Sequence, residues 1–518
     1  MNTDKSAIRM IAMLGGVILL AVVVAIAWRY FAAPVIEEKK AEEAKQQAEK
    51  EMFQGDNIRI GIEPFAGYAV LRSPEFNGFL AEDNLHAVIM DMPDYNERMS
   101  ALESGEIHMA AMTIDSTLVV GNKSDSYPGL IFFTIDESRG ADGVATFKKV
   151  IPNVEALNRP DAQIVLTPDS PDETLTRHMI SGMLPALSGN DKWMIKANGA
   201  DEVYRQLRRD SGTLPRAYVL YEPALSRALE VEGVHLIYDS SNIPSTIMDV
   251  MVVNRRYLEA EPIKVLQVTE AYFRALYYHT SKPDGIVQLL LADGKQTGDM
   301  PSEAQARRMA QGILFKNCME NYAHFGIVPV DVSRGLPRLD TVIGQIARLL
   351  QKTGKLDGYT RAGREQELYT TQILASMHQQ NFLPGVGQDE NMRGNTELPA
   401  LSEDQWKTLV IVGTMDAQTI DFRRGQSEPS TQGKRDLEDI AQRITAWPNF
   451  YLEVIGHARA EGDPEANKRL AFNRAQAVGN QLLLLGINPN RVHITAAEPT
   501  ATDGRGQSVT FTLLRHAY

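Results

Sequence analysis

The sequence has few of the residues from which catalytic and metal centres are usually built. Cys318 is the single cysteine among 518 residues, so the chain forms no internal disulfide and carries no cysteine cluster for structural zinc. The ten histidines are scattered singly. A Gly-x-Ser-x-Gly elbow, a paired-histidine zinc motif and a phosphate-binding glycine loop with lysine are all missing. The sequence therefore predicts a protein that is not an enzyme and that uses no cofactor.

Positive charge is also in short supply. Lysine and arginine total 53 against 66 aspartate and glutamate residues, which gives a net charge of −13 and argues against a nucleic-acid partner. The apolar fraction of 43% and the charged fraction of 23% are ordinary for globular proteins and exclude wholesale disorder. At roughly 150 residues per domain, the length predicts about three to four units.

The chain contains one long hydrophobic run. From Met10 to Ala27 every residue is apolar or glycine, and a helix of that length spans about 27 Å, close to the thickness of a bilayer core. Trp28 and Tyr30 follow it, where aromatic side chains anchor a helix at the interface. We therefore expect a cytoplasmic segment over 1–9 and a transmembrane anchor over 10–31.

A cleaved signal peptide is the alternative interpretation of this run. Lys5 and Arg9 form a positive leader, and Ala25-Ile26-Ala27 is similar to a cleavage site. Signal peptides usually carry a shorter apolar region of about 7–15 residues, which favours the retained anchor. Residues 32–55 are rich in charged helix formers with few apolar positions, so they are expected to form a solvated stalk and not a coiled coil.

Residues 56–378 alternate between predicted strands and helices. Ile58–Ile62, His86–Met90 and Ile107–Met112 are expected strands, and Asp94 is placed to cap a helix that ends before Gly105. This alternation predicts parallel strands with helices on the faces of the sheet. In such sheets ligands bind at the carboxyl ends of the strands.

The order and spacing of six segments in this region resemble the nitrate, sulfonate and taurine branch of periplasmic solute-binding proteins. These segments read GIEPFAGYAVL, DYNERMSALESGEIHMAAMTIDSTL, TIDESRGADGV, VLTPDSPDETL, YEPALSRAL and STIMDVMVVNRRYLEAEP. The resemblance implies an α/β fold of the type 2 periplasmic-binding class, with two lobes joined by hinge strands. It also implies a small anionic ligand that is clamped between the lobes and released to an inner-membrane ABC permease.

Loops and helix starts after the expected strands supply the candidate ligand-binding residues. Ser170 precedes a proline and two acids, a pattern typical of a helix N-terminus, whose free N–H groups suit an anion. Arg139 would fork onto an oxyanion, or alternatively pair with Glu137 or Asp142 in its own loop, where Gly140 and Gly143 permit positive φ. For Tyr68, Tyr221 and Glu222, cleft lining and plain packing are equally compatible with the sequence. The complete candidate set is Phe65, Gly67, Tyr68, Thr113, Asp115, Arg139, Ser170, Glu173, Tyr221 and Glu222.

A stretch rich in Gln, Asn, Gly and Pro over 379–404 is expected to be a linker to a last domain at 405–518. Strands are expected at Leu409–Val412, Thr419–Phe422, Phe450–Ile455 and Val509–Leu514, with helices at Gln432–Thr445 and Asn467–Leu485. These elements predict a small β-α-β-α-β domain of ordinary size.

The phrase VIGHARAEGDPEANKRLAFNRAQAVGNQLLLLGINPNRV resembles the OmpA-like peptidoglycan-binding domain. In that family an Asp and a later Arg hold the zwitterionic end of diaminopimelate, so the resemblance implies a peptidoglycan site at Asn467 and Arg474. At the family's Asp position this chain has Arg459, and a second guanidinium would repel the ligand's ammonium group. Glu461 is a substitute only if the loop takes a different path.

Together these features predict a receptor tethered in the inner membrane, with its N-terminus inside and most of the chain in the periplasm. The two-lobed domain would bind a small anion, and the OmpA-like domain would contact peptidoglycan or another envelope component. The alternative is an envelope scaffold or stress-sensor subunit, in which both domains bind proteins or peptidoglycan and transport plays no part.

Overall fold

The computed structural model describes residues 56–123, 127–189, 191–328, 336–384, 398–414, 420–423, 425–445, 450–459, 461–498 and 508–516. The predicted n-region at 1–9, anchor at 10–31 and stalk at 32–55 lie outside these residues, as does the middle of the predicted linker. No helix within the described ranges combines the length and apolar character needed to cross a bilayer.

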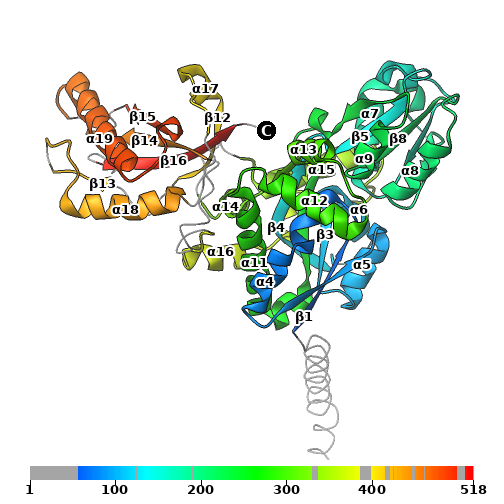
Figure 1. Cartoon of the computed structure of the whole chain (residues 1–518), viewed down its shortest axis with the longest axis horizontal. Helices are drawn as coiled ribbons and strands as arrows, with labels where there is room; N and C mark the ends of the chain where they lie inside the picture. Colours follow the sequence, from blue (N-terminus) through cyan, green and yellow to red (C-terminus); the bar gives the residue numbers. More distant parts are fainter. Residues whose placement is uncertain are drawn as a thin grey trace, which may run out of the picture. The chain divides into compact units, whose positions relative to one another are not determined.

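The first lobe is built on a six-stranded sheet with the order β11-β4-β10-β3-β1-β2 (Figure 1). β1 runs parallel to both β2 and β3, as the alternation of strands and helices predicts. β10 runs antiparallel to β3 and β4. It is the strand with which the chain returns to this sheet after it has built the second lobe. The strands are β1 (Asn57–Ile62), β2 (His86–Asp91), β3 (Met109–Thr113), β4 (Gly129–Ser138), β10 (Met248–Asn254) and β11 (Ile313–Phe315).

Helices flank this sheet, and several of them begin at a residue whose side chain caps the helix. Asp94 accepts hydrogen bonds from the backbone of Asn96 and Glu97, and so caps α5 as expected. The helices of this lobe and of the segment that follows it are α3 (Ala69–Arg72), α4 (Pro74–Ala81), α5 (Tyr95–Ser104), α6 (Ile114–Gly121), α10 (Arg255–Ala260), α11 (Pro262–Thr280), α12 (Gly285–Thr297), α13 (Glu303–Gly312), α14 (Cys318–His324), α15 (Leu339–Lys352) and α16 (Gln372–Gln379).

The second lobe has its own five-stranded sheet, in the order β7-β6-β8-β5-β9. Its strands are β5 (Asp142–Phe147), β6 (Gln163–Leu166), β7 (Met194–Lys196), β8 (Arg216–Tyr221) and β9 (Val234–Asp239), with helices α7 (Pro171–Met183), α8 (Ala200–Arg209) and α9 (Ala224–Leu229). Leu166, Leu175, Met179 and Val219 belong to one fully buried cluster between this sheet and α7. Each lobe thus encloses a hydrophobic core of its own, as a two-lobed protein requires.

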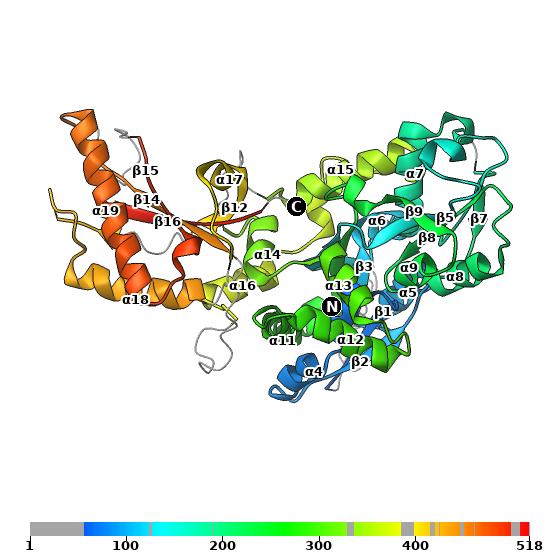
Figure 2. The same ribbon diagram turned by 45° about the horizontal axis from the view of Figure 1, so that its top comes forward.

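The chain crosses between the two sheets twice. The first crossing follows β4, and the second runs from β9 through a short 3-10 turn at Ser240–Asn242 to β10. Ser240 joins them, because its hydroxyl accepts a hydrogen bond from the Gly140 backbone at 2.7 Å and lies 2.7 Å from the Ser138 hydroxyl. Gly140 has the expected positive φ of 117°, whereas Gly143 lies in the extended strand β5, and the expectation for it was wrong. The two crossings confirm the two-lobed arrangement (Figure 2).

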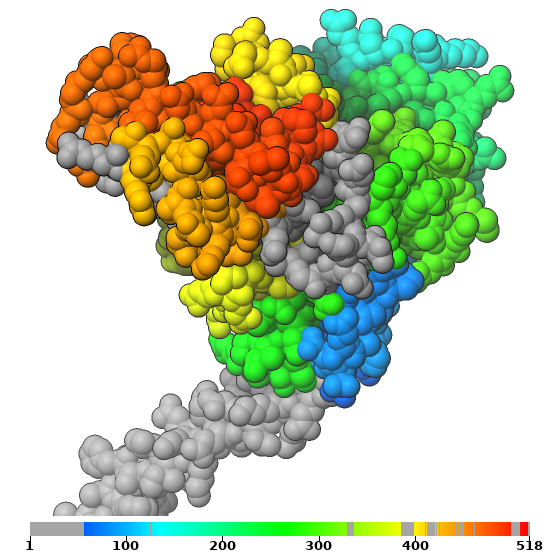
Figure 3. Space-filling model, turned by 60° about the vertical axis from the view of Figure 1, so that its left-hand side comes forward, coloured from blue at the N-terminus to red at the C-terminus, as the bar shows by residue number. Residues whose placement is uncertain are grey.

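The C-terminal domain carries a third sheet in which β12, β16, β14 and β15 are neighbours and β13 also pairs with β16. Its elements are α17 (Glu403–Thr408), β12 (Leu409–Thr414), β13 (Ile420–Asp421), α18 (Thr431–Thr445), β14 (Tyr451–Gly456), α19 (Pro464–Leu484), β15 (Val492–Ala496) and β16 (Ser508–His516). The sequence analysis did not predict β15, which pairs in parallel with β14. Figure 3 shows the outer sides of α18 and α19, gold and orange, at the surface of this domain.

Candidate functional site

Four carboxyl groups lie buried where the two lobes meet. Glu63 follows β1, Asp115 lies in the first turn of α6, Asp142 begins β5 and Asp172 lies in the first turn of α7. The first two belong to the first lobe and the last two to the second. Their exposed fractions are 3%, 1%, 2% and 0% in the same order. We call these four residues the interlobe carboxyl cluster.

A single guanidinium accompanies this cluster on the side of the first lobe. Arg98, on α5, is 0% exposed, and its Nη2 atom lies 3.8 Å from Oε2 of Glu63. The Tyr95 hydroxyl donates a hydrogen bond to the other oxygen of Glu63. Arg98 also donates to the backbone carbonyls of Met92 at 2.9 Å and of Ala111 at 2.6 Å. Its charge is therefore shared between Glu63 and the backbone.

The cluster contains polar atoms that the described part of the chain leaves without a hydrogen-bond partner. Thr174 donates to Oδ2 of Asp115 at 2.5 Å across the two lobes, but Oδ1 of Asp115 has no partner. The Thr167 backbone donates to Oδ2 of Asp172 at 3.4 Å, and Oδ1 of Asp172 has none. The Thr167 hydroxyl is likewise buried and unpartnered. Oε2 of Glu63, Nη2 of Arg98 and the hydroxyl of Tyr221 are also buried without a hydrogen-bond partner. Buried polar atoms normally find partners, so this group of acceptors and donors makes the region the candidate binding site.

Burial raises the pKa of every carboxyl in the interlobe carboxyl cluster, because the charged form loses its hydration. The pKa of Asp142 rises to about 7, first through burial and then through the negative charges of Asp115 and Glu63. The pKa of Asp172 lies well above its usual range, through burial and then through Asp142 and Glu63. The carboxyls therefore interact with one another, which places them in one site.

Several of the residues predicted from sequence line this site. Phe65 packs edge-on against Tyr68 at 5.3 Å and against Tyr221 of the second lobe at 5.9 Å, between ring centroids. Gly67 is required by close approach, since a Cβ atom there would lie 2.4 Å from an oxygen of Asp136. Tyr68 donates a hydrogen bond to Asp249, at the first-lobe side of the site.

Asp136 and Asp249 lie beside the cluster as a second carboxyl pair. Burial raises the pKa of both groups, and the charge of Asp136 raises the pKa of Asp249 further. Thr113, also predicted as a ligand residue, caps α6 and donates to the Ser116 hydroxyl at 2.7 Å. Thr113 therefore supports the first turn of α6, in which Asp115 lies.

A pocket of about 360 Å³ opens at the mouth of this site between the lobes. Tyr95, which donates to Glu63, and Thr167, which contacts Asp172, both belong to its lining. The pocket therefore reaches the cluster from outside. The complete lining is Asp94, Tyr95, Asn96, Thr167, Pro168, Lys196, Ala197, Asn198 and Glu202.

Ion pairs beside the pocket hold the lobes together. Lys355, from the segment after α15, contacts Asp169 and Glu173 of the second lobe, each at 2.6 Å. Lys123 of the first lobe lies 2.8 Å from Asp169. Glu173 also pairs with Arg177 at 2.7 Å. Glu173, a predicted ligand residue, therefore has its oxygens engaged in closing the lobes.

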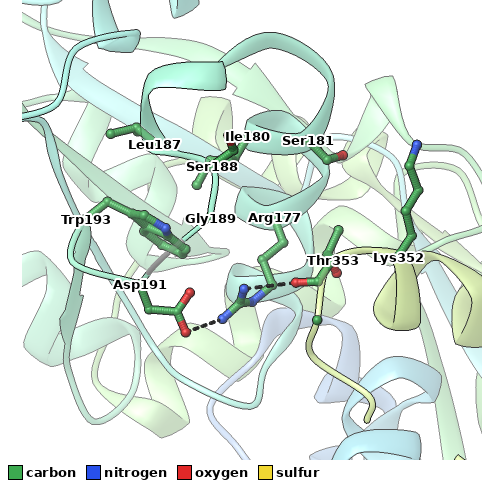
Figure 4. A pocket seen from close by; sticks show the side chains of 11 residues that line it. Arg177, Ile180, Ser181, Leu187, Ser188, Gly189, Asp191, Trp193, Lys352 and Thr353 are labelled. Carbon is green, nitrogen blue, oxygen red and sulfur yellow. Dashed lines mark hydrogen bonds and ion pairs between the residues drawn. The ribbon is translucent and has the colours of Figure 1, made fainter.

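A second cavity, of about 470 Å³, lies farther out along α7 (Figure 4). Arg177 crosses it and donates to Asp191 at 2.9 Å and to the Thr353 carbonyl at 3.2 Å. The guanidinium also lies 5.6 Å from the ring centre of Trp193. Because its central cation is already paired, this cavity is a weaker candidate for a ligand than the interlobe site.

The remaining predicted residues have structural partners. Arg139 lies 3.6 Å from Glu137, which is the pairing within its own loop that the sequence left open. Ser170 caps α7 by accepting from the Asp172 backbone at 3.2 Å. Glu222 accepts two hydrogen bonds from Ser226, both at 2.9 Å. Ser170 thus accepts backbone N–H groups at the N-terminus of α7, and the buried Asp172 carboxyl lies in the same turn, which disfavours the anion predicted there.

The sequence analysis did not assign Glu63, Tyr95, Arg98, Asp142, Thr167 or Asp172 to the site. Glu63 and Thr167 directly follow strands β1 and β6, the positions at which ligands bind in open α/β sheets. That positional signal was present in the sequence. The sequence did not show that these side chains point into the site.

In the C-terminal domain, Arg474 is only 1% exposed and is held by backbone carbonyls. Its Nε donates to Gln426 at 2.9 Å, and its guanidinium lies 5.2 Å from the ring centre of Phe422. Asn467 donates to the Glu461 carbonyl at 2.8 Å, and Arg459 is exposed. Arg459 is therefore accessible to a ligand from solvent, whereas the side chain of Arg474 is buried and already bound by the backbone.

Comparisons with known proteins found a family model for the C-terminal domain and similar solved structures for about 60% of the chain. The model of the OmpA family matches residues 421–508, which confirms the predicted OmpA-like domain. Similar solved structures include the alkanesulfonate-binding protein SsuA from Xanthomonas axonopodis pv. citri bound to MOPS, at 15% identity, with 60% of this chain and 98% of that chain covered and a TM-score of 0.46. The nitrate-binding protein NrtA from Synechocystis PCC 6803 is similar at 10% identity, with 64% and 90% covered and a TM-score of 0.49.

A third similar structure is the ligand-binding component of an ABC-type import system from Staphylococcus aureus with zinc bound, at 12% identity, with 62% and 98% covered and a TM-score of 0.46. All three are solute-binding or ligand-binding proteins by description, and each is similar to about 60% of this chain. No curated protein matches the chain.

Proposed function

We propose that this chain is a solute-binding receptor of the cell envelope. Its two lobes would close on a small ligand, its N-terminal segment would tether it to the inner membrane, and its C-terminal domain would contact another envelope component. The observation that carries this proposal is the buried site between the lobes, where Asp115, Thr167 and Asp172 each keep an unpartnered polar atom. In a binding protein, such atoms are satisfied by the ligand.

Thermal unfolding of the full chain in the presence of small charged solutes tests the receptor function. A ligand at about 100 times its dissociation constant adds roughly 2.7 kcal/mol of stability, which raises the unfolding temperature by several degrees. The panel should include nitrate, alkanesulfonates, amines and guanidinium compounds at constant ionic strength. If no solute of either charge shifts unfolding, the receptor proposal fails and the envelope scaffold becomes the better explanation.

For the C-terminal domain we propose a contact with peptidoglycan that Arg459 weakens. Arg459 is exposed and stands where the OmpA-like pattern has an acid that would pair with the ligand's ammonium group. Arg459→Asp is therefore expected to increase, several-fold, the fraction of the full chain that sediments with purified sacculi. Arg469→Asp makes the same change of charge at another exposed position of this domain and serves as the control.

The two variants together separate a local effect from a general one. If both raise sedimentation equally, the gain comes from net charge and not from the site. If neither does, the family's ligand contact does not transfer to this domain, and a protein partner is favoured in its place.

A further inference from the structure

The interlobe site contains more acidic side chains than basic ones. The interlobe carboxyl cluster brings Glu63, Asp115, Asp142 and Asp172 together, and Arg98 is the cation that the described residues place beside it. Arg98 also donates to two backbone carbonyls, which reduces the charge it can offer to a ligand. A buried anion here would meet carboxyl groups on both lobes, and the lysines beside the pocket, Lys123 and Lys355, are already paired with carboxylates of the second lobe.

Among the charged groups of the site, acceptor atoms without a partner outnumber donor atoms without one. The acceptors are Oε2 of Glu63, Oδ1 of Asp115 and Oδ1 of Asp172, and the donor is Nη2 of Arg98. Oδ1 of Asp115 comes from the first lobe and Oδ1 of Asp172 from the second, so a ligand between them would be held by both lobes. Thr167 of the second lobe is 3% exposed, and its hydroxyl also has no partner. A hydroxyl can either accept a hydrogen bond from a ligand or donate one to it. Carboxylate oxygens accept hydrogen bonds, and their strongest partners are ammonium and guanidinium N–H groups.

Aromatic rings line the same site and favour an organic cation. Phe65 packs edge-on against Tyr68 of its own lobe and against Tyr221 of the second lobe, and Tyr95 lines both the cluster and the pocket. The faces of such rings attract cations. Within the described residues no three carboxyl, imidazole or thiol groups converge as ligands of one metal ion. A cation with N–H groups spread over several atoms fits the separate acceptors better.

The pocket at the mouth of the site provides an entry route and indicates the size of the ligand. Its volume of about 360 Å³ lies at the lower end of small-molecule sites, which suits a ligand of a few heavy atoms. Its charged lining consists of Asp94, Glu202 and Lys196, with Lys196 exposed at the rim. The mouth therefore carries more negative than positive side chains, like the site beneath it.

We propose that the ligand clamped between the lobes is a small organic cation with ammonium or guanidinium groups, bound by Asp115 and Asp172 from opposite lobes. This inference rests on the proposed receptor function and names its ligand class. It differs from the small anion that the sequence resemblance implies, because the charge of the site depends on side chains that the resemblance does not determine.

Thermal unfolding and calorimetry of the full chain at pH 8 test the sign of the ligand. The cationic probes are agmatine, putrescine, methylguanidinium and choline, and the anionic probes are nitrate and ethanesulfonate, all at equal ionic strength. We expect at least one cationic probe to raise the unfolding temperature by several degrees and both anions to leave it unchanged. Asp115→Asn and Asp172→Asn keep the shape of the site and should weaken that binding more than tenfold.

The outcomes distinguish this inference from the function on which it rests. If nitrate or ethanesulfonate binds and no cationic probe does, the receptor stands and the ligand class is wrong. If no probe of either sign binds, both proposals fail. Asp83→Asn, at an exposed position of the first lobe, is the control for a general loss of negative charge. If it weakens binding as much as Asp115→Asn, the attraction is diffuse and the assigned contacts are wrong.

Discussion

Replacing Arg98 by methionine is expected to lower the unfolding temperature of the ligand-free protein by about 10 °C, through a loss of about 3–5 kcal/mol. The guanidinium is fully buried, lies 3.8 Å from Glu63 and sits 4.6 Å from the ring centre of Tyr95. Removing it leaves the Glu63 carboxyl buried without its ion-pair partner, and leaves the carbonyls of Met92 and Ala111 without a donor. Thermal unfolding of the full chain measures the effect. A pH of 8 is chosen because the Glu63 carboxyl would there lose its proton to the solvent unless its buried surroundings retain it.

A matched arginine and a second substitution show whether the loss has this cause. Arg208 is exposed in the last turn of α8, and Arg208→Met is expected to change stability by less than about 0.5 kcal/mol. Adding Glu63→Gln to Arg98→Met should recover part of the loss, because the uncompensated carboxyl is then gone. An Arg98→Met protein that unfolds at the wild-type temperature would show that Arg98 does not stabilise the cluster.

The local structure around this site could be predicted from sequence, because caps and strand ends follow short-range rules. Asp94 and Ser170 cap α5 and α7, as the residues after them indicated. Gly140 takes the positive φ that the first crossing requires. In the C-terminal domain β15 was not predicted, and it is stabilised by pairing with β14 and by packing under α19. Such long-range support leaves little local signal in a five-residue strand.

The charge of the site could not be predicted, because it depends on which way each side chain turns. Asp172 was placed correctly in the first turn of α7, yet that turn was interpreted as an anion site. In the structure the Asp172 carboxyl is fully buried and itself accepts the Thr167 backbone N–H. Glu63 and Asp142 are 79 positions apart in the sequence, and the fold brings them together where the two lobes meet. A spacing pattern within one segment of the sequence cannot predict that two such distant residues lie close together.

The pH dependence of stability gives the last test of the interlobe carboxyl cluster. Burial raises the pKa of Asp142 to about 7, so between about pH 4 and 7 the folded protein holds a proton there that the unfolded chain has released. The folded state therefore binds more protons in this window, and its stability falls as the pH rises towards 7. Asp142→Asn removes the titration. We expect it to be more stable than the wild type at pH 8, by on the order of a few kcal/mol, with little difference at pH 4.

The comparison must be made as a difference between the two proteins, because other groups titrate in the opposite sense. Burial lowers the pKa of His324 to about 4 and that of His108 to about 3, so these side chains stabilise the fold as the pH rises. Their contribution is the same in both proteins and cancels in the difference. A pH-independent difference for Asp142→Asn would mean that Asp142 is ionised throughout, and that the cluster already holds a compensating positive charge.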